Sequence, residues 1–132
     1  METYAFYYSD NITDVYVRDV DAWINLTNTI KYGNITLPNA DGKLHVYKKN
    51  NSKELTEINV ADGVDAIGSN AFRNAKNITK VTMPDSLVTI RDWAFSNCSG
   101  LTSIDARAIK TIENYAYWEC HGFVNIVLPD TV

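Results

Sequence analysis

Few side chains in this 132-residue chain are of the types that carry out acid–base or nucleophilic chemistry. The two histidines, His45 and His121, have no serine, cysteine or acid at a spacing that predicts a catalytic triad or a metal cluster. The two cysteines, Cys98 and Cys120, form no Cys-x-x-Cys pair, so they do not make a zinc-binding motif. We therefore expect no catalytic residue, no metal site and no cofactor.

Three acids offer one further candidate site, because Asp62, Asp85 and Asp130 recur at one position of a repeating pattern. Carboxylate chemistry or calcium binding is one interpretation. A single aspartate per repeat, however, does not make the cage of several oxygens that calcium needs. Aspartate side chains commonly accept hydrogen bonds from backbone amides in turns, so we favour turn capping.

The elements that would position these residues repeat about every 23 residues. Four segments carry apolar side chains at their first, fourth and sixth positions and start 23, 23 and 22 residues apart: Leu55–Val60, Ile78–Met83, Leu101–Ala106 and Phe123–Leu128. A fixed period of this length is typical of a solenoid, in which each unit buries its apolar face against its neighbours. The fold class that we expect is therefore a repeat solenoid, which presents an extended surface rather than a reactive pocket.

Within each unit, the alternation of apolar and polar residues predicts a strand. The side chains that should point inward are Ile58, Val60, Val81, Met83, Ile104, Ala106, Ile126 and Leu128. An alanine followed by a large ring recurs later in the unit, at Ala71-Phe72, Ala94-Phe95 and Ala116-Tyr117. We expect the alanine to lie at a tight turn and the ring to fill the interior of the coil.

The outward side chains of the same strands make up the candidate binding face. They are Asp14, Tyr16, Glu57, Asn59, Lys80, Thr82, Ser103, Asp105, Asn125 and Val127. Most are short and polar, and only Tyr16 and Lys80 have the size of an interface anchor. Two interpretations stay open: a shallow face that binds protein or glycan, and a plain solvated sheet.

The chain divides into three parts. Residues 1–17 contain another Ala-Phe pair and match the tail of a preceding repeat and its strand, residues 18–54 are an insertion, and residues 55–132 hold the repeats, the last of them truncated. Neither end has the polar capping unit that solenoids use, so we expect a segment of a longer array. The alternative is a natural short protein whose ends are covered by a partner or a second copy. The strand near 124–128 would then be an exposed edge, open to end-to-end or edge-strand self-association.

The insertion has local patterns of its own. Early acids followed by apolar residues predict a short helix over Asp19–Leu26 that packs Trp23 onto the end of the sheet. A turn at 37–42 and a strand at 44–47 follow, and we expect this strand to form a hairpin with the first repeat.

The second repeat, 78–100, shows the unit most fully. It contains Ile78-Thr-Lys-Val81-Thr-Met83-Pro84, then Leu87-Val-Thr-Ile90, then Ala94-Phe95-Ser-Asn-Cys98. This pattern resembles the BspA-like, Treponema pallidum-type class of leucine-rich repeats. The first and third repeats lack the proline, the first has Ala75 in place of the cysteine, and the fourth is truncated.

The resemblance implies a curved, mostly β solenoid with short turns and helical pieces and one parallel strand face. It also implies a secreted or cell-surface protein of a host-associated bacterium, without enzymatic activity, that takes part in adhesion. A host extracellular matrix protein or a glycan would be the partner. The alternative function is a purely structural spacer within a longer surface array.

Composition excludes other classes. A formal net charge of -4 with scattered lysines and arginines argues against a nucleic-acid partner. No apolar run approaches the roughly 20 residues of a transmembrane segment. The start of the sequence lacks the basic and apolar regions of a signal peptide.

Two modifications stay open. Six Asn-x-Ser/Thr triplets either are glycosylation acceptors or reflect a chain rich in Asn and Thr; they begin at Asn11, Asn25, Asn34, Asn50, Asn77 and Asn97. Cys98 and Cys120 share one position in adjacent coils, and a strand spacing of about 4.8 Å would permit a disulfide. Their side chains would run parallel rather than converge, which favours two free thiols in the core.

Overall fold

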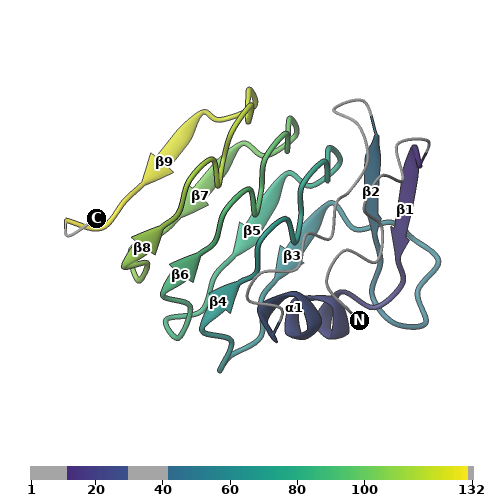
Figure 1. Cartoon of the computed structure of the whole chain (residues 1–132), viewed down its shortest axis with the longest axis horizontal. Coiled ribbons are helices and arrows are strands. Elements are labelled where there is room, and N and C mark those ends of the chain that lie inside the picture. Colours follow the sequence, from purple (N-terminus) through teal and green to yellow (C-terminus); the bar gives the residue numbers. More distant parts are fainter. Residues whose placement is uncertain (1–11, 30–41, 131–132) are drawn as a thin grey trace.

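The structure is a computed structural model that describes residues 12–29 and 42–130. Its main body is a solenoid in which strands from successive coils line up into two parallel sheets (Figure 1). One sheet contains β3 (Glu57–Asn59), β5 (Lys80–Thr82), β7 (Ser103–Asp105) and β9 (Asn125–Val127), and the other contains β4 (Ala66–Ile67), β6 (Thr89–Ile90) and β8 (Thr111–Ile112). The expected repeat solenoid is therefore confirmed. Residues 1–11 of the predicted half-unit, which include Ala5-Phe6, lie outside the described residues, and so does the predicted turn at 37–42 apart from Gly42.

The core lies between the two sheets and follows the predicted pattern in the first three strands of the larger sheet. Six of the eight predicted inward side chains are buried or packed against the core: Ile58, Val60, Val81, Met83, Ile104 and Ala106. The prediction is wrong for Ile126 and Leu128, which are 51% and 50% exposed. Both belong to the last described coil, and no further described coil covers their side chains.

Aromatic rings stack through the interior at one ring per coil. The ring centroids of Phe72 and Phe95 lie 5.4 Å apart, and those of Phe95 and Tyr117 also lie 5.4 Å apart. Main-chain hydrogen bonds run beside the stack: Phe72 N donates to Ala94 O at 2.7 Å, and Phe95 N donates to Ala116 O at 2.8 Å. The predicted interior rings are thus confirmed, and the hydrogen bonds hold their spacing.

The predicted helix is present as α1 (Val20–Thr29), which ends three residues later than expected. Asp19 caps its N-terminus, since Oδ1 of Asp19 accepts a hydrogen bond from Ala22 N at 3.2 Å. Val20, Ile24 and Thr27 form its buried face. The helix lies beside the first coil, against β4 (Figure 1).

Helix α1 covers the N-terminal end of the solenoid. Trp23 Nε1 donates to Ala71 O at 2.6 Å. In the next coil the equivalent carbonyl, Ala94 O, accepts a main-chain N–H from the coil before it. The indole of Trp23 therefore replaces the donor that a preceding coil would supply. The packing is close, because a Cβ on Gly68 would lie 2.2 Å from Thr27 O.

Strands β1 (Asp14–Val17) and β2 (Lys43–Val46) form a separate parallel sheet with the register Val15↔Leu44. The strand that we matched to a preceding repeat therefore does not join the ladder of β3. The expected hairpin between β2 and the first repeat is reduced to a single antiparallel bridge between Tyr47 and Glu54. Instead, β2 forms its ladder with β1.

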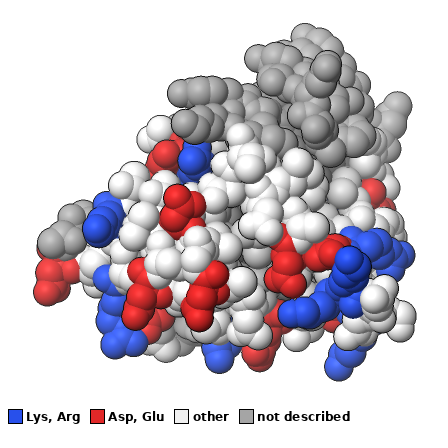
Figure 2. Space-filling model, turned by 90° about the horizontal axis from the view of Figure 1, so that it is seen from below, with Lys and Arg blue, Asp and Glu red and all other residues white. Residues whose placement is uncertain are grey.

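Charged side chains of both signs lie among uncharged residues on the face seen in Figure 2. On that face the described lysines and arginines lie close to acidic side chains, so the view shows no purely basic surface of the kind that binds a phosphate backbone. In the described ranges, no helix has the length and apolar character that crossing a membrane would require.

Candidate functional site

The predicted binding face is hollowed where β5, β7 and β9 lie side by side. A groove of about 730 Å³ lies over these strands. Six of the predicted face residues line it: Lys80, Thr82, Ser103, Asp105, Asn125 and Val127. Val81 and Ile104 of the same strands, whose side chains are buried in the core, also line it. The structure therefore brings these six residues together into one concave surface.

Charges of both signs stand around the groove. Asp105 accepts a hydrogen bond from Arg107 Nε at 2.8 Å, and a second nitrogen of the same guanidinium contacts the other carboxylate oxygen. The hydrogen bond from Arg107 lowers the pKa of Asp105, and the same bond raises the pKa of Arg107. Lys80 and Asp85 also line the groove. The site can thus offer a cation or an anion to a partner, with one guanidinium held in place.

Sequence reasoning missed Arg107, because this residue lies two positions beyond the end of the strand pattern, although it continues the outward parity of Ser103 and Asp105. A signal was available in Asp105-Ala-Arg107, where an acid precedes an arginine by two residues at a strand end. Arginine matters here because it is one of the residue types that dominate binding energy at interfaces.

The remaining face residues lie outside the groove. Glu57 and Asn59 are exposed on β3 and pair in register with Lys80 and Thr82, so they continue the same face toward the first coil. Asp14 and Tyr16 lie on the β1–β2 sheet. The predicted face is therefore divided between two sheets.

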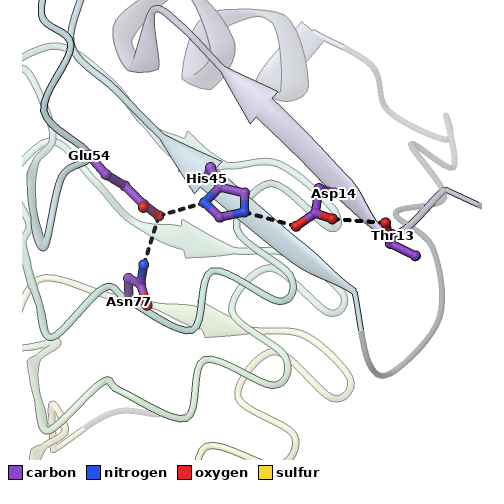
Figure 3. Close-up of polar contacts among 5 residues, drawn as sticks. All are labelled: Thr13, Asp14, His45, Glu54 and Asn77. Atoms are coloured by element: carbon purple, nitrogen blue, oxygen red, sulfur yellow. Dashed lines mark hydrogen bonds and ion pairs between the residues drawn. The ribbon is translucent and has the colours of Figure 1, made fainter.

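A polar network joins the β1–β2 sheet to the first coil of the solenoid (Figure 3). His45 Nε2 lies 3.0 Å from Asp14 Oδ1, and His45 Nδ1 lies 3.1 Å from Glu54 Oε1. Asn77 Nδ2 donates to Glu54 Oε1 at 2.9 Å, and Thr13 Oγ1 donates to Asp14 Oδ2 at 2.8 Å. Ionised carboxylates only accept hydrogen bonds, so this geometry requires a proton on both ring nitrogens of His45.

The pKa of His45 is shifted in the direction that its contacts favour. Burial lowers its pKa, but the hydrogen bonds with Asp14 and Glu54 raise it by more, and the net pKa is raised. The ring also stacks on Tyr16, with centroids 4.6 Å apart. Asp14 and Glu54 bind opposite sides of the ring, so the three groups do not converge on one metal ion. Within 12–29 and 42–130, no group of three or more His, Cys, Asp and Glu could hold one.

Both cysteines are free thiols at one position of adjacent coils. Cys98 Sγ donates to Phe72 O at 3.0 Å, and Cys120 Sγ donates to Phe95 O at 3.0 Å. Burial raises the pKa of Cys98 well above its usual value and that of Cys120 to about 11. Neither sulfur is therefore a thiolate nucleophile near neutral pH.

The aspartates at one repeat position, Asp62, Asp85 and Asp130, are all exposed. Their role in turn capping stays a prediction.

A second cluster, the aromatic row, consists of Trp93, Tyr115 and Trp118. The rings of Trp93 and Tyr115 stack with centroids 4.4 Å apart and planes 20° apart. Trp118 stands at 77° to Tyr115, with centroids 5.5 Å apart. Trp93 and Tyr115 each directly precede the alanine of an alanine–ring pair, so they share one position of adjacent repeats, but sequence reasoning did not identify them as a surface. The signal was that Phe95 and Tyr117 already fill the interior of the same coils.

The fold and its faces define a class of repeat proteins, the leucine-rich-repeat solenoids, whose extended surfaces serve for binding. The profile of the BspA type leucine rich repeat region matches residues 45–132 in six copies. The chain belongs to this family. The match begins within the segment that we assigned to the insertion and includes the end of β2.

A solved structure has a similar fold: the crystal structure of a leucine rich cell surface protein from Faecalibacterium prausnitzii A2-165, with a TM-score of 0.52 and 24% sequence identity. The alignment covers 63% of this chain and 23% of that protein, so this chain spans less than a quarter of the length of that relative. No curated protein matches this chain.

Proposed function

We propose that this chain is a protein-interaction segment of a secreted or cell-surface leucine-rich repeat protein, and that it binds its partner through the groove over β5, β7 and β9. The observation that carries the proposal is the concentration of predicted face residues in one concave site with charges of both signs. A host extracellular matrix protein is the partner that the family resemblance favours, and a glycan is the second.

The architecture supports a binding role. The strands under the groove have their inward side chains in a closely packed core, with Val81 and Ile104 at most 4% exposed. A surface of this kind is organised before the partner arrives, which reduces the free energy that binding must spend on ordering side chains. The Asp105–Arg107 pair adds a preset charge pattern, and such patterns favour partner selection and encounter rate.

We further propose that the segment has no enzymatic activity. Its buried thiols are protonated, and His45 is engaged by two carboxylates rather than by a nucleophile. The family resemblance and the printed description of the relative as a cell surface protein support a secreted or surface location.

The structural spacer is the second candidate function. It is favoured by the short polar side chains of the face, such as Thr82 and Ser103, and by the absence of Tyr16 from the groove.

Binding of the immobilised segment to a panel of extracellular matrix proteins and glycans tests the proposal. The double variant Lys80→Ala/Arg107→Ala should weaken saturable binding about fivefold or more, the loss expected for an interface anchor. The matched control Lys49→Ala/Lys110→Ala removes the same charge from exposed positions outside the groove. Equal losses in both variants would contradict a groove-centred site, and no saturable binding by the parent chain would favour the spacer.

A further inference from the structure

The aromatic row is an exposed surface separate from the groove. Tyr115 and Trp118 are 53% and 51% exposed, and Trp93 is half-buried. None of the three lines the groove over β5, β7 and β9. The row therefore needs its own explanation.

The backbone beneath the row is strained. Trp93 and Tyr115 have φ values of 59° and 57°, in the left-handed region that bulky residues rarely adopt. The first coil has Asn70 at the same position, with φ 59°, and asparagine tolerates this conformation. Strain of this kind points to a role for the side chain. The core does not require these rings, because Phe95 already fills the interior of its coil.

One end of the row already holds a cation. The guanidinium carbon of Arg73 lies 5.1 Å from the ring centroid of Trp93, whose ring also stacks on Tyr115. Arg73 has no ion pair with any described residue, and its Nε is buried without a hydrogen-bond partner. Attraction to the ring face is thus the principal polar contact of this guanidinium.

The other end of the row is open. Tyr115 remains half-exposed although one of its faces meets Trp93, and Trp118 stands nearly perpendicular to it. Two rings at this angle form a corner with two aromatic walls, which is the arrangement that binds cations through ring faces. Glu119 is exposed directly beside Trp118, and the chain has a formal net charge of -4. Both features favour a positively charged occupant.

We propose that the corner between Tyr115 and Trp118 binds an arginine or lysine side chain of a partner protein. The contact between Arg73 and Trp93 shows the same pairing within this molecule. Trp and Tyr are also residue types that anchor protein interfaces. The proposal goes beyond the groove-centred function, because it concerns a different surface and a cationic partner group.

The test uses the intact chain and two short peptides that differ only in charge, one with arginine and one with citrulline between glycines. Chemical shifts of the Trp118 indole report binding. The arginine peptide should bind about two- to fivefold more tightly, as expected for an exposed cation–π contact. Trp118→Ala should abolish this preference, and Trp118→Phe should retain it. Tyr16→Ala is the matched control, because Tyr16 has the same 53% exposure as Tyr115 but lies on the β1–β2 sheet.

Several outcomes would overturn the proposal. Equal affinity for the two peptides excludes a charge-selective corner, and an unchanged preference in Trp118→Ala places the cation elsewhere. Stronger binding of chitotriose than of the arginine peptide would identify a sugar site. If Trp118→Ala changed only the self-association of the chain in sedimentation, the occupant of the corner would be a second copy of the chain. The double variant Lys80→Ala/Arg107→Ala should leave the preference for the arginine peptide intact. The proposed corner and the proposed groove-centred function can therefore be refuted separately.

Discussion

Removing the charge on His45 should weaken the attachment of the β1–β2 sheet to the solenoid. In the folded chain the ring bridges Asp14 and Glu54, one on each nitrogen, and only the imidazolium can donate to both (Figure 3). Deprotonation leaves one carboxylate without its donor. The substitution His45→Gln also removes one of the two bonds, and it does so at every pH.

The pH window follows from the directions of the two pKa shifts. The pKa of His45 is raised from 6.5, because the bonds with Asp14 and Glu54 outweigh the opposing effect of burial. Its stabilisation is therefore complete below the unfolded pKa and is lost as pH rises through the folded pKa. The pKa of Asp14 is lowered from 3.8, chiefly by the hydrogen bond with His45. The contribution of Asp14 to stability is therefore present above its unfolded pKa and is lost as pH falls through its folded pKa.

The magnitude is set by exposure. A hydrogen bond to a charged group contributes about 1.5–3 kcal/mol when it is shielded from water. The side chains of His45 and Glu54 are 15% and 25% exposed, and Asp14 is 40% exposed, so solvent screening reduces the effect. We expect loss of the His45 charge to lower the free energy of unfolding by about 1 kcal/mol. For a chain of this length, Tm would fall by about 3–6 °C.

Thermal unfolding of the parent chain, His45→Gln and His121→Gln, followed by circular dichroism from about pH 6 to about pH 8.5, measures this effect. The parent and the control, which replaces an exposed histidine in a turn, should both lose stability as pH rises. The variant His45→Gln should have a lower Tm than the parent at about pH 6, and its Tm should fall less as the pH rises. Parallel profiles for all three proteins would refute the argument, as would an NMR titration that places the pKa of His45 below 6.5.

Three further predictions concern the solenoid itself. Phe95→Ala should lower the free energy of unfolding by about 3–5 kcal/mol in urea, because the ring is fully buried between two others; a loss below about 1 kcal/mol would contradict this packing. Trp23→Phe should lower the free energy of unfolding by about 1–3 kcal/mol, because Ala71 O would lose its hydrogen-bond donor. Unchanged amide-exchange protection of the first coil in this variant would count against the capping role of α1. Adding one more coil after β9 should raise Tm and reduce self-association in sedimentation, because Ile126 and Leu128 would be covered; no change in either would count against an open edge.

Short-range patterns were sufficient for the coils. The inward positions of β3, β5 and β7 follow from an alternation over six residues, and the interior rings follow from the Ala-Phe pairs. The free state of the thiols also followed from the parallel direction of equivalent side chains, since Cys98 and Cys120 each bind the carbonyl of the previous coil. In each case the period fixes neighbours in space that are distant in sequence.

The contacts outside the period could not be predicted in this way. Asp14 and His45 are 31 residues apart and meet only because β2 pairs with β1, which no local pattern indicated. The face was expected to be continuous through Asp14 and Tyr16, whereas the structure places these residues on a separate sheet. Helix α1 explains the difference, because Trp23 occupies the hydrogen-bonding position that a preceding coil would need.

The comparison of equivalent positions shows where function can differ between coils. Interior positions vary little, with Phe72, Phe95 and Tyr117 in one stack. The interior-ring position, which Phe95 occupies in the second coil, is part of the core, and the position directly after it carries Arg73, Ser96 and Trp118 in successive coils. Both a buried serine (Ser96, 2% exposed) and a half-exposed ring (Trp118, 51% exposed) fit this position. A large ring placed there is therefore not required by the fold, and this is the physical reason for assigning binding to the aromatic row rather than to the stack beneath it.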